Sequence, residues 1–185
     1  MDVILTGHPV PAEEEYRIGL VNRLVPVEEE LTAVPVWQGG GMSDLDDPSD
    51  PPAGWRRQHT KEYVATDCAK GHRWQGTTTL LLTTCGRRTG KARRTSLIYG
   101  RDGEAYLIVA SKGGSDSHPL WYLNLAADPH VRLQVGSEKL DATARTATAD
   151  EKKRLWPVMT AEWPAYDDYQ QKTSRDIPLV TLEPR

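Results

Sequence analysis

The sequence predicts an α+β fold, mainly β, in which an antiparallel sheet curls into a barrel with flanking helices. About six segments between residues 77 and 184 have the Thr-, Leu- and Val-rich composition of strands. Most of them follow one another through short turns, which favours antiparallel pairing. Few segments have a helical pattern, and this combination is typical of a barrel.

The first elements of the folded domain are a polar helix and three strands. The helix is expected over residues 56–71, and the run TTTLLLTTC (77–85) predicts a buried strand. Residues 94–100 and 104–111 predict a hairpin, because Asp102-Gly103 between two apolar runs is a strong turn signal.

Helices surround a second hairpin in the rest of the domain. Residues 117–129 fit a helix, with Ser117 as its N-cap and Pro119 in its first turn. Residues 130–136 and 138–148 predict the hairpin. Two helical segments broken at Pro164 and a final strand, IPLVTLEP, complete the chain.

Composition divides the chain into three parts: a short extension over 1–37, a linker over 38–55 and the domain over 56–185. The segment from Gln38 to Trp55 is mostly Gly, Pro, Asp and Ser, which predicts a disordered linker. Residues 1–55 hold eleven acids against two arginines, so the remainder is basic although the whole chain carries a formal charge of −3. This asymmetry indicates a basic domain that meets an anionic ligand, nucleic acid or a membrane surface.

Cysteine count and hydropathy favour a cytoplasmic protein. Two cysteines, Cys68 and Cys85, are too few for a disulfide framework. No apolar run has the length of a spanning helix, and the acidic N-terminus does not have the layout of a signal peptide. A peripheral contact with the inner face of the membrane stays open.

The turn after the first strand concentrates positive charge. Its five cations have no acid among them: Arg87, Arg88, Lys91, Arg93 and Arg94. A guanidinium binds phosphate or carboxylate through two parallel hydrogen bonds, and Gly86 and Gly90 let a backbone approach a ligand closely. A solvated hairpin and a non-specific nucleic-acid patch are the alternatives.

A second candidate segment, VASKGGSDSHPLWYLNL (109–125), runs from a strand into a helix. Small residues and backbone N–H groups at such a place favour a phosphate or a flat cofactor ring. An ordinary strand-to-helix connection is the alternative.

Together, the basic turn, SKGG, PxWYLNL and WPxYxxYQxKTxRxIP resemble the deazaflavin-dependent nitroreductase family, whose members use the coenzyme F420. The likeness runs from about Lys61 to Glu183. It implies a split β-barrel related to flavin-nucleotide-binding oxidoreductases, with the coenzyme lying in a groove. It also implies an F420H2-dependent reductase that transfers a hydride to a quinone, a nitroaromatic compound or an activated enone or lactone.

The resemblance also implies site residues. The phosphate and carboxylate tail of the coenzyme would meet Arg87, Arg88, Thr89, Lys91 and Arg93. Its ring system would meet Arg94, Thr95, Ser96, Ala110, Ser111, Lys112, Trp121 and Asn124.

The substrate side of the pocket is implied at Trp163, Tyr166 and Tyr169, although core or surface aromatics of a terminal helix are the alternative. Ser111 and Tyr166 are the candidates to polarise the acceptor or relay a proton. No metal is expected, and the protein is expected to be a monomer or a homodimer that does not bind nucleic acid.

Residues 1–31 resemble a fragment of the enoyl-CoA hydratase (crotonase) family, around LTG and GLVNRLVP. The acid/base residues of that family lie upstream of this fragment, so no acyl-CoA chemistry is inferred. Three other functions stay open: an FMN-dependent or pyridoxamine-phosphate oxidase-like enzyme on the same barrel, a non-catalytic F420 carrier, and a nucleic-acid-binding module.

Overall fold

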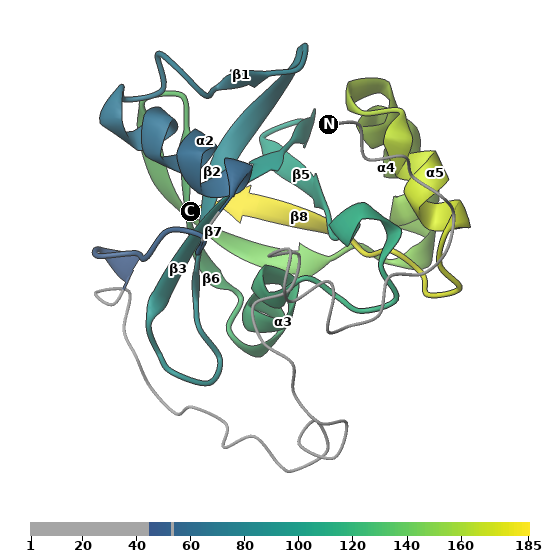
Figure 1. The fold of residues 1–185 in the computed structure, drawn as a ribbon. Coiled ribbons are helices and arrows are strands. Elements are labelled where there is room, and N and C mark those ends of the chain that lie inside the picture. The colour runs from purple at the N-terminus through teal and green to yellow at the C-terminus, as the bar shows by residue number, and fades with distance from the viewer. Residues whose placement is uncertain (1–44, 53) are drawn as a thin grey trace.

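The computed structural model describes residues 45–52 and 54–185. The crotonase-like fragment lies outside these residues. The described chain forms an eight-stranded antiparallel sheet with helices packed around it (Figure 1). The strands are β1 (Arg73–Trp74), β2 (Thr77–Cys85), β3 (Ala92–Ile98), β4 (Gly100–Asp102), β5 (Ala105–Val109), β6 (His130–Val135), β7 (Glu138–Thr146) and β8 (Leu179–Pro184).

The sheet curls into the expected split barrel. Hydrogen-bonded neighbours follow the order β1-β2-β6-β7-β8-β5-β4, and β3 is a further partner of β2 outside this order. Two-residue loops close the β4–β5 and β6–β7 hairpins, with Asp102 opposite Ala105 and Val135 opposite Glu138. Gly103 and Gly136 begin these loops at φ of 61° and 63°, a left-handed conformation that glycine adopts without strain.

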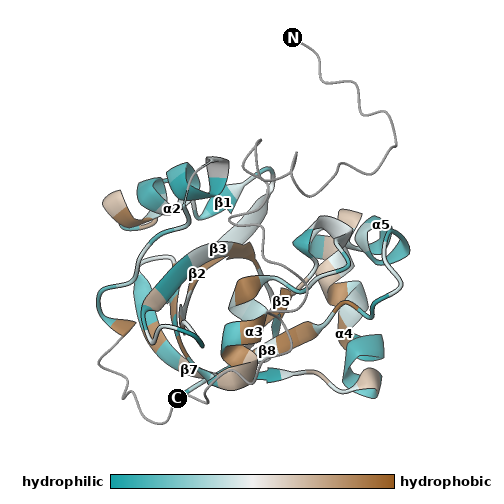
Figure 2. Ribbon diagram, turned by 60° about the horizontal axis from the view of Figure 1, so that its bottom comes forward, coloured by the Kyte–Doolittle hydropathy of each residue, from teal (hydrophilic) through white to brown (hydrophobic). Residues whose placement is uncertain are grey.

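Successive side chains on a strand point to opposite faces of the sheet, and apolar side chains on both faces form two separate core clusters. On β5, Tyr106 and Ile108 face the inside of the barrel, whereas Leu107 and Val109 belong to a second cluster on the outside. The inner cluster also takes Leu80 and Leu82 of β2. Figure 2 shows brown stretches on strands β5 and β8, whereas much of helix α2 is teal. Both faces of β5 are therefore buried.

In the part of the chain that the structure describes, the sheet is flanked by helices α2 (Trp55–Ala65), α3 (Leu120–Ala127), α4 (Ala149–Glu162) and α5 (Ala165–Gln171) and by the 3₁₀ turn η3 (Lys112–Gly114). Helix α2 lies on β3, α3 contacts β2 and β7, and α4 lies against β4 and β5. Helix α4 begins with a capping box in which Thr148 and Glu151 exchange side-chain and backbone hydrogen bonds. The break between α4 and α5 at Pro164 is confirmed.

Three local expectations were wrong. Helix α3 begins at Leu120 after Pro119, and Ser117 makes no cap, because residues 112–118 form a separate loop before the helix. Helix α2 ends at Ala65, since Asp67 and Cys68 take positive φ values of 45° and 75° that stop the helix. The strand expected over 94–100 is divided: β3 pairs with β2, and only β4 (Gly100–Asp102) pairs with β5, so that hairpin turns at Gly103.

Residues 45–50, here called the strap, were expected to be part of a disordered linker, yet they dock on β3. Ser49 forms a parallel bridge with Arg93, with its N–H donating to Ala92 O at 3.0 Å and its carbonyl accepting from Arg94 N at 3.0 Å. Leu45 is buried against Cys85 and Ala92. The strap therefore covers the free edge of β3 with backbone bonds and one apolar contact.

The hydroxyl of Tyr63 links α2 to the sheet. Tyr63 is fully buried, and its Oη accepts from Gly136 N at 2.8 Å and lies 3.1 Å from His72 Nδ1. Burial raises the pKa of Tyr63 to about 12. The phenol therefore joins helix, sheet and the β6–β7 loop in its protonated form.

We predict that Tyr63→Phe lowers the free energy of unfolding by about 1–3 kcal/mol, because the Gly136 N–H loses its acceptor inside the protein. Urea unfolding followed by circular dichroism measures this loss. Between pH 10 and 12 the unfolded chain releases the phenolic proton while the folded chain retains it, so stability falls as pH rises through this window. The decline should be shallower in Tyr63→Phe, and an equal decline in both proteins would contradict the assignment.

A second prediction concerns the strap. A chain lacking residues 1–52 should be less stable than a chain lacking residues 1–44 by about 2–4 kcal/mol, because it loses the buried Leu45 side chain and the backbone bonds of Ser49. Both truncated chains lack residues 1–44, so the difference between them isolates residues 45–52, which contain the strap. Equal melting temperatures would show that the strap contributes nothing.

Candidate functional site

The basic turn occupies residues 86–91, between β2 and β3, and is tightly folded. Gly90 N and Thr89 N both donate to Gly86 O, at 2.7 and 3.0 Å, and Gly86 N donates to Lys91 O at 2.9 Å. A Cβ at Gly86 would lie 3.0 Å from Lys91 O, so glycine is needed for the close approach. Arg88, Thr89 and Lys91 are exposed around this compact backbone.

Asn124 of α3 forms hydrogen bonds with the basic turn and with the end of β2. Its Oδ1 accepts from Arg87 N at 3.2 Å, and its Nδ2 donates to Thr84 Oγ1 at 3.2 Å. The side chain is only 7% exposed, so both bonds are shielded from water. Asn124 therefore contacts the basic turn through the backbone of Arg87, and its expected role at the coenzyme stays a prediction.

The register of β3 divides the expected coenzyme residues between two faces. Arg93 and Thr95 lie opposite Thr84 and Leu82, on the face of the inner core. Arg94 and Ser96 lie on the other face, beside the strap and α2. There Arg94 donates to Asp50 Oδ1 from Nε at 2.9 Å and from Nη2 at 2.6 Å, and Ser96 Oγ lies 3.4 Å from His59 Nδ1. The structure does not gather all four residues round one space.

The loop that follows β5 carries Ala110, Ser111 and Lys112. Ala110 is fully buried and Ser111 is 9% exposed. Lys112, Gly113 and Gly114 take φ values of 48°, 66° and 86°, so the chain makes three successive left-handed steps. A Cβ at Gly114 would lie 2.8 Å from Tyr169 O, so the backbones of α5 and this loop pack too closely for a larger residue.

Arg175 holds the same loop and was missed as a site residue. Its Nη2 donates to Ala110 O at 3.1 Å and to Ser111 O at 2.8 Å, and its Nε donates to Ser115 O at 2.7 Å. The arginine was visible in the motif KTxRxIP, but a motif cannot show that its partners are carbonyls sixty residues away.

The C-terminal aromatics lie in different environments. Trp163 is half-buried at the end of α4, and its ring lies 5.7 Å from that of Trp74. Tyr166 is 5% exposed within the second core cluster, and burial raises its pKa. Tyr169 is half-buried, 6.2 Å from the Tyr166 ring, with Lys172 Nζ 5.6 Å from its centroid. Trp163 and Tyr169 are thus partly accessible, whereas Tyr166 packs behind them.

Trp121 lies on α3 and is half-buried against the inner core. Its ring meets Tyr122 edge to face at 6.2 Å. Tyr122 in turn lies 4.9 Å from the ring of His118, in the loop before the helix. Trp121 therefore joins α3 to the core beside the loop that carries Ser111.

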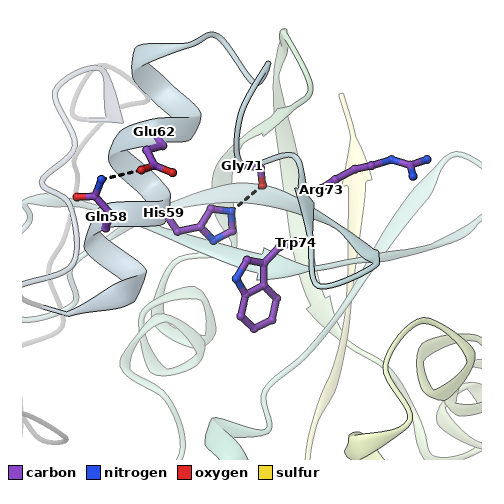
Figure 3. Close-up of a pocket in the computed structure, with 6 residues that line it drawn as sticks. All are labelled: Gln58, His59, Glu62, Gly71, Arg73 and Trp74. Carbon is purple, nitrogen blue, oxygen red and sulfur yellow. Dashed lines mark hydrogen bonds between the residues drawn. The ribbon is translucent and has the colours of Figure 1, made fainter.

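A pocket of about 280 Å³ lies where α2 meets β1 (Figure 3). His59 Nε2 lies 2.6 Å from Gly71 O, and the His59 ring stacks on Trp74 at 6.1 Å. Figure 3 shows Arg73 pointing away from these two rings. Because Trp74 also contacts Trp163, a continuous aromatic row runs from this pocket to the end of α4. Sequence patterns did not single out Trp74, which sits in a two-residue strand.

The described residues supply exposed cations at the basic turn and partly accessible aromatic rings at Trp74 and Trp163. The exposed cations Arg88 and Lys91 complement phosphate or carboxylate. Within residues 45–52 and 54–185, no cluster of His, Cys, Asp and Glu is arranged to hold a metal ion. In the same residues no helix is long and apolar enough to cross a membrane.

Comparison with solved structures agrees with this architecture. A structure described as an F420-H2 dependent reductase superposes with a TM-score of 0.54 at 40% identity, covering 57% of this chain and 93% of that one. Another, described as a domain-swapped dimer, has a TM-score of 0.56 at 35% identity and covers 69% and 96% of the two chains. The split-barrel fold with flanking helices is confirmed.

Sequence comparison identifies the family. The chain is 44% identical over 133 residues to an F420H(2)-dependent quinone reductase of Mycobacterium tuberculosis, which covers 70% of this chain and 89% of the relative. It is 37% identical over 107 residues to a second protein of that organism, named a putative F420H(2)-dependent quinone reductase. The family model for F420H(2)-dependent quinone reductase matches residues 55–184. The chain therefore belongs to the F420H(2)-dependent quinone reductase family.

Proposed function

We propose that this protein reduces a quinone with F420H2 as the hydride donor. Family membership supports the reaction. In this chain the supporting observation is the hydrogen bond between the basic turn and Asn124 of α3. Asn124 fixes the backbone of the turn, and the exposed cations Arg88 and Lys91 project from it. A fixed turn with exposed cations suits a ligand with an anionic tail.

The described residues fit the coenzyme at its anionic end. When bound, F420H2 supplies the hydride and its own ring chemistry, as cofactors generally do. Arg87, Arg88, Thr89, Lys91 and Arg93 would hold its phosphate and carboxylates through charge-assisted hydrogen bonds. Arg94 and Ser96 would act indirectly, because Arg94 is engaged by Asp50 and both lie on the face covered by the strap and α2.

On the ring side, Ala110, Ser111 and Lys112 would flank the coenzyme, with Trp121 on the adjoining helix. Ser111 is the proposed group that polarises the acceptor carbonyl, because a hydroxyl can donate to developing negative charge on oxygen. Its loop is rigidly held, which keeps that hydroxyl in place.

The acceptor would lie against Trp163 and Tyr169. Tyr166 supports both from within the second core cluster, and its burial favours packing over proton relay. Nitroaromatic compounds and activated enones are further candidate acceptors. We also propose a homodimer, in line with the relative described as a domain-swapped dimer, and a peripheral membrane contact when the acceptor is a lipid-soluble quinone.

The direct test mixes the purified full chain with F420H2 and menadione and follows coenzyme oxidation by absorbance. Binding of F420, FMN and a short DNA duplex is measured in parallel. We expect F420 binding and oxidation, with weak affinity for FMN and duplex. Tight FMN binding without affinity for F420 would overturn the proposal in favour of a flavin enzyme on the same barrel.

Removing two cations from the basic turn should weaken coenzyme binding. Arg87→Ala with Arg88→Ala should cost about 2–4 kcal/mol, or about 30- to 700-fold in dissociation constant, since two charge-assisted bonds are lost while the backbone remains. Fluorescence titration with F420 measures this change. Arg154→Ala is the matched control, because Arg154 pairs with Asp102 in an exposed ion pair on α4. An unchanged affinity in the double variant would show that the turn points elsewhere.

Ser111→Ala should lower kcat by about 10²-fold or more while leaving the dissociation constant of F420 within a small factor, because the hydroxyl acts on the developing charge of the acceptor. Ser115→Ala is the control, since Ser115 lies in the same loop and its hydroxyl contacts Ser117. Steady-state kinetics with menadione separates kcat from KM. Equal kcat in the two variants would remove Ser111 from the chemistry.

A further inference from the structure

The guanidinium of Arg175 is surrounded by backbone oxygens of one loop. Its Nε and Nη2 donate to the carbonyls of Ala110, Ser111 and Ser115 at 2.7–3.1 Å. Its Nη1 lies 3.3 Å from His118 Nδ1. One side chain thus contacts both ends of residues 110–118, which we call the ring loop.

These bonds fix the direction in which the loop presents its amides. In a trans peptide the carbonyl of one residue and the N–H of the next point in opposite directions. Because the carbonyls of Ala110 and Ser111 point at Arg175, the N–H groups of Ser111 and Lys112 point away from it. Arg175 therefore defines a back side of the ring loop, and the amides of Ser111 and Lys112 face the front.

The loop conformation is one that the chain would not adopt unaided. Lys112 has a φ of 48°, and a left-handed backbone costs a non-glycine residue about 1 kcal/mol or more. Support comes from α5 and the segment after it. Thr173 Oγ1 donates to Asp116 Oδ1 at 2.6 Å, and a Cβ at Gly114 would lie 2.8 Å from Tyr169 O.

The chemistry of the contact requires arginine. Three carbonyls and a ring nitrogen are acceptors spread around a planar fork, and a lysine ammonium cannot reach them together. Burial and the nearby Arg175 charge lower the pKa of His118, which keeps its ring neutral and able to accept from Nη1.

We propose that Arg175 is a positioning residue for the reductase reaction, holding the ring loop so that Ser111 and Lys112 face the coenzyme and its acceptor. This inference rests on the proposed function. It assigns Arg175 no contact with coenzyme or substrate, and its effect passes through the backbone of residues 110–115.

The experiment compares Arg175→Ala and Arg175→Lys with the wild type and with the Arg154→Ala control, all as the full chain. Hydrogen–deuterium exchange of the coenzyme-free protein should speed up at least tenfold in peptides covering residues 110–118, and not in β2 or β6, because bonds to a charged donor are lost. The dissociation constant of F420 should rise about tenfold, and kcat should fall by more than KM changes.

Arg175→Lys should resemble Arg175→Ala, because a lysine ammonium keeps the charge but cannot form the three hydrogen bonds of the planar guanidinium. If the alanine variant fails to fold, the lysine variant is used for the same measurements. Guanidinium at tens of millimolar should restore part of kcat in Arg175→Ala and none in Arg154→Ala.

Unchanged exchange in the ring loop, or normal F420 affinity and kcat in a folded Arg175 variant, would overturn the inference alone. A wild type that neither binds nor oxidises F420H2 would instead overturn the proposed function, whatever the exchange data show.

Discussion

Strand β2 is the element on which the rest of the domain depends, because it is paired along both edges. It bonds to β3 from Thr79 to Cys85 and to β6 from Leu81 to Thr84. Eight of its nine residues are buried; Leu80 and Leu82 face the inner core, and Leu81 is buried on the other face. A strand held in this way cannot slip in register without exposing one leucine set. The basic turn starts directly after it, so the position of the cations is fixed by the most constrained strand in the sheet.

Much of the fold could be predicted from the sequence because the signals were local. The Leu-rich run of β2, the Asp-Gly near the first hairpin and Pro164 between two helices act within a few residues. Helix α3 was misjudged at its start because Ser117 is a good cap in isolation. Its hydroxyl instead accepts from Lys112 Nζ at 2.6 Å, within a loop held by distant contacts. Local propensity could not reveal that loop.

The candidate site was only partly predictable, for a related reason. The run of cations was visible in the sequence, yet the placement of Arg93 and Arg94 on opposite faces depends on the register of β3. The segment expected to be a linker supplies Asp50 to Arg94 and Asp46 to Arg132, so acids of the strap neutralise part of the basic domain. Arg175 and Trp74 act through tertiary contacts, and neither stood out by spacing. The resemblance implied which residues would meet the coenzyme, and the contacts in the structure show which of those side chains are already engaged by other protein groups.

The strap has a consequence for how copies of the protein meet. An open strand edge is a template for pairing with a second chain, and natural proteins protect such edges. Here Ser49 occupies backbone groups of Ala92 and Arg94 that another molecule would otherwise use. Self-association through β3 would therefore require exchange of one strand-like partner for another. That exchange would release Asp50 from Arg94 at the same time, so quaternary structure and the charge of the basic face are coupled by a few residues that precede the domain.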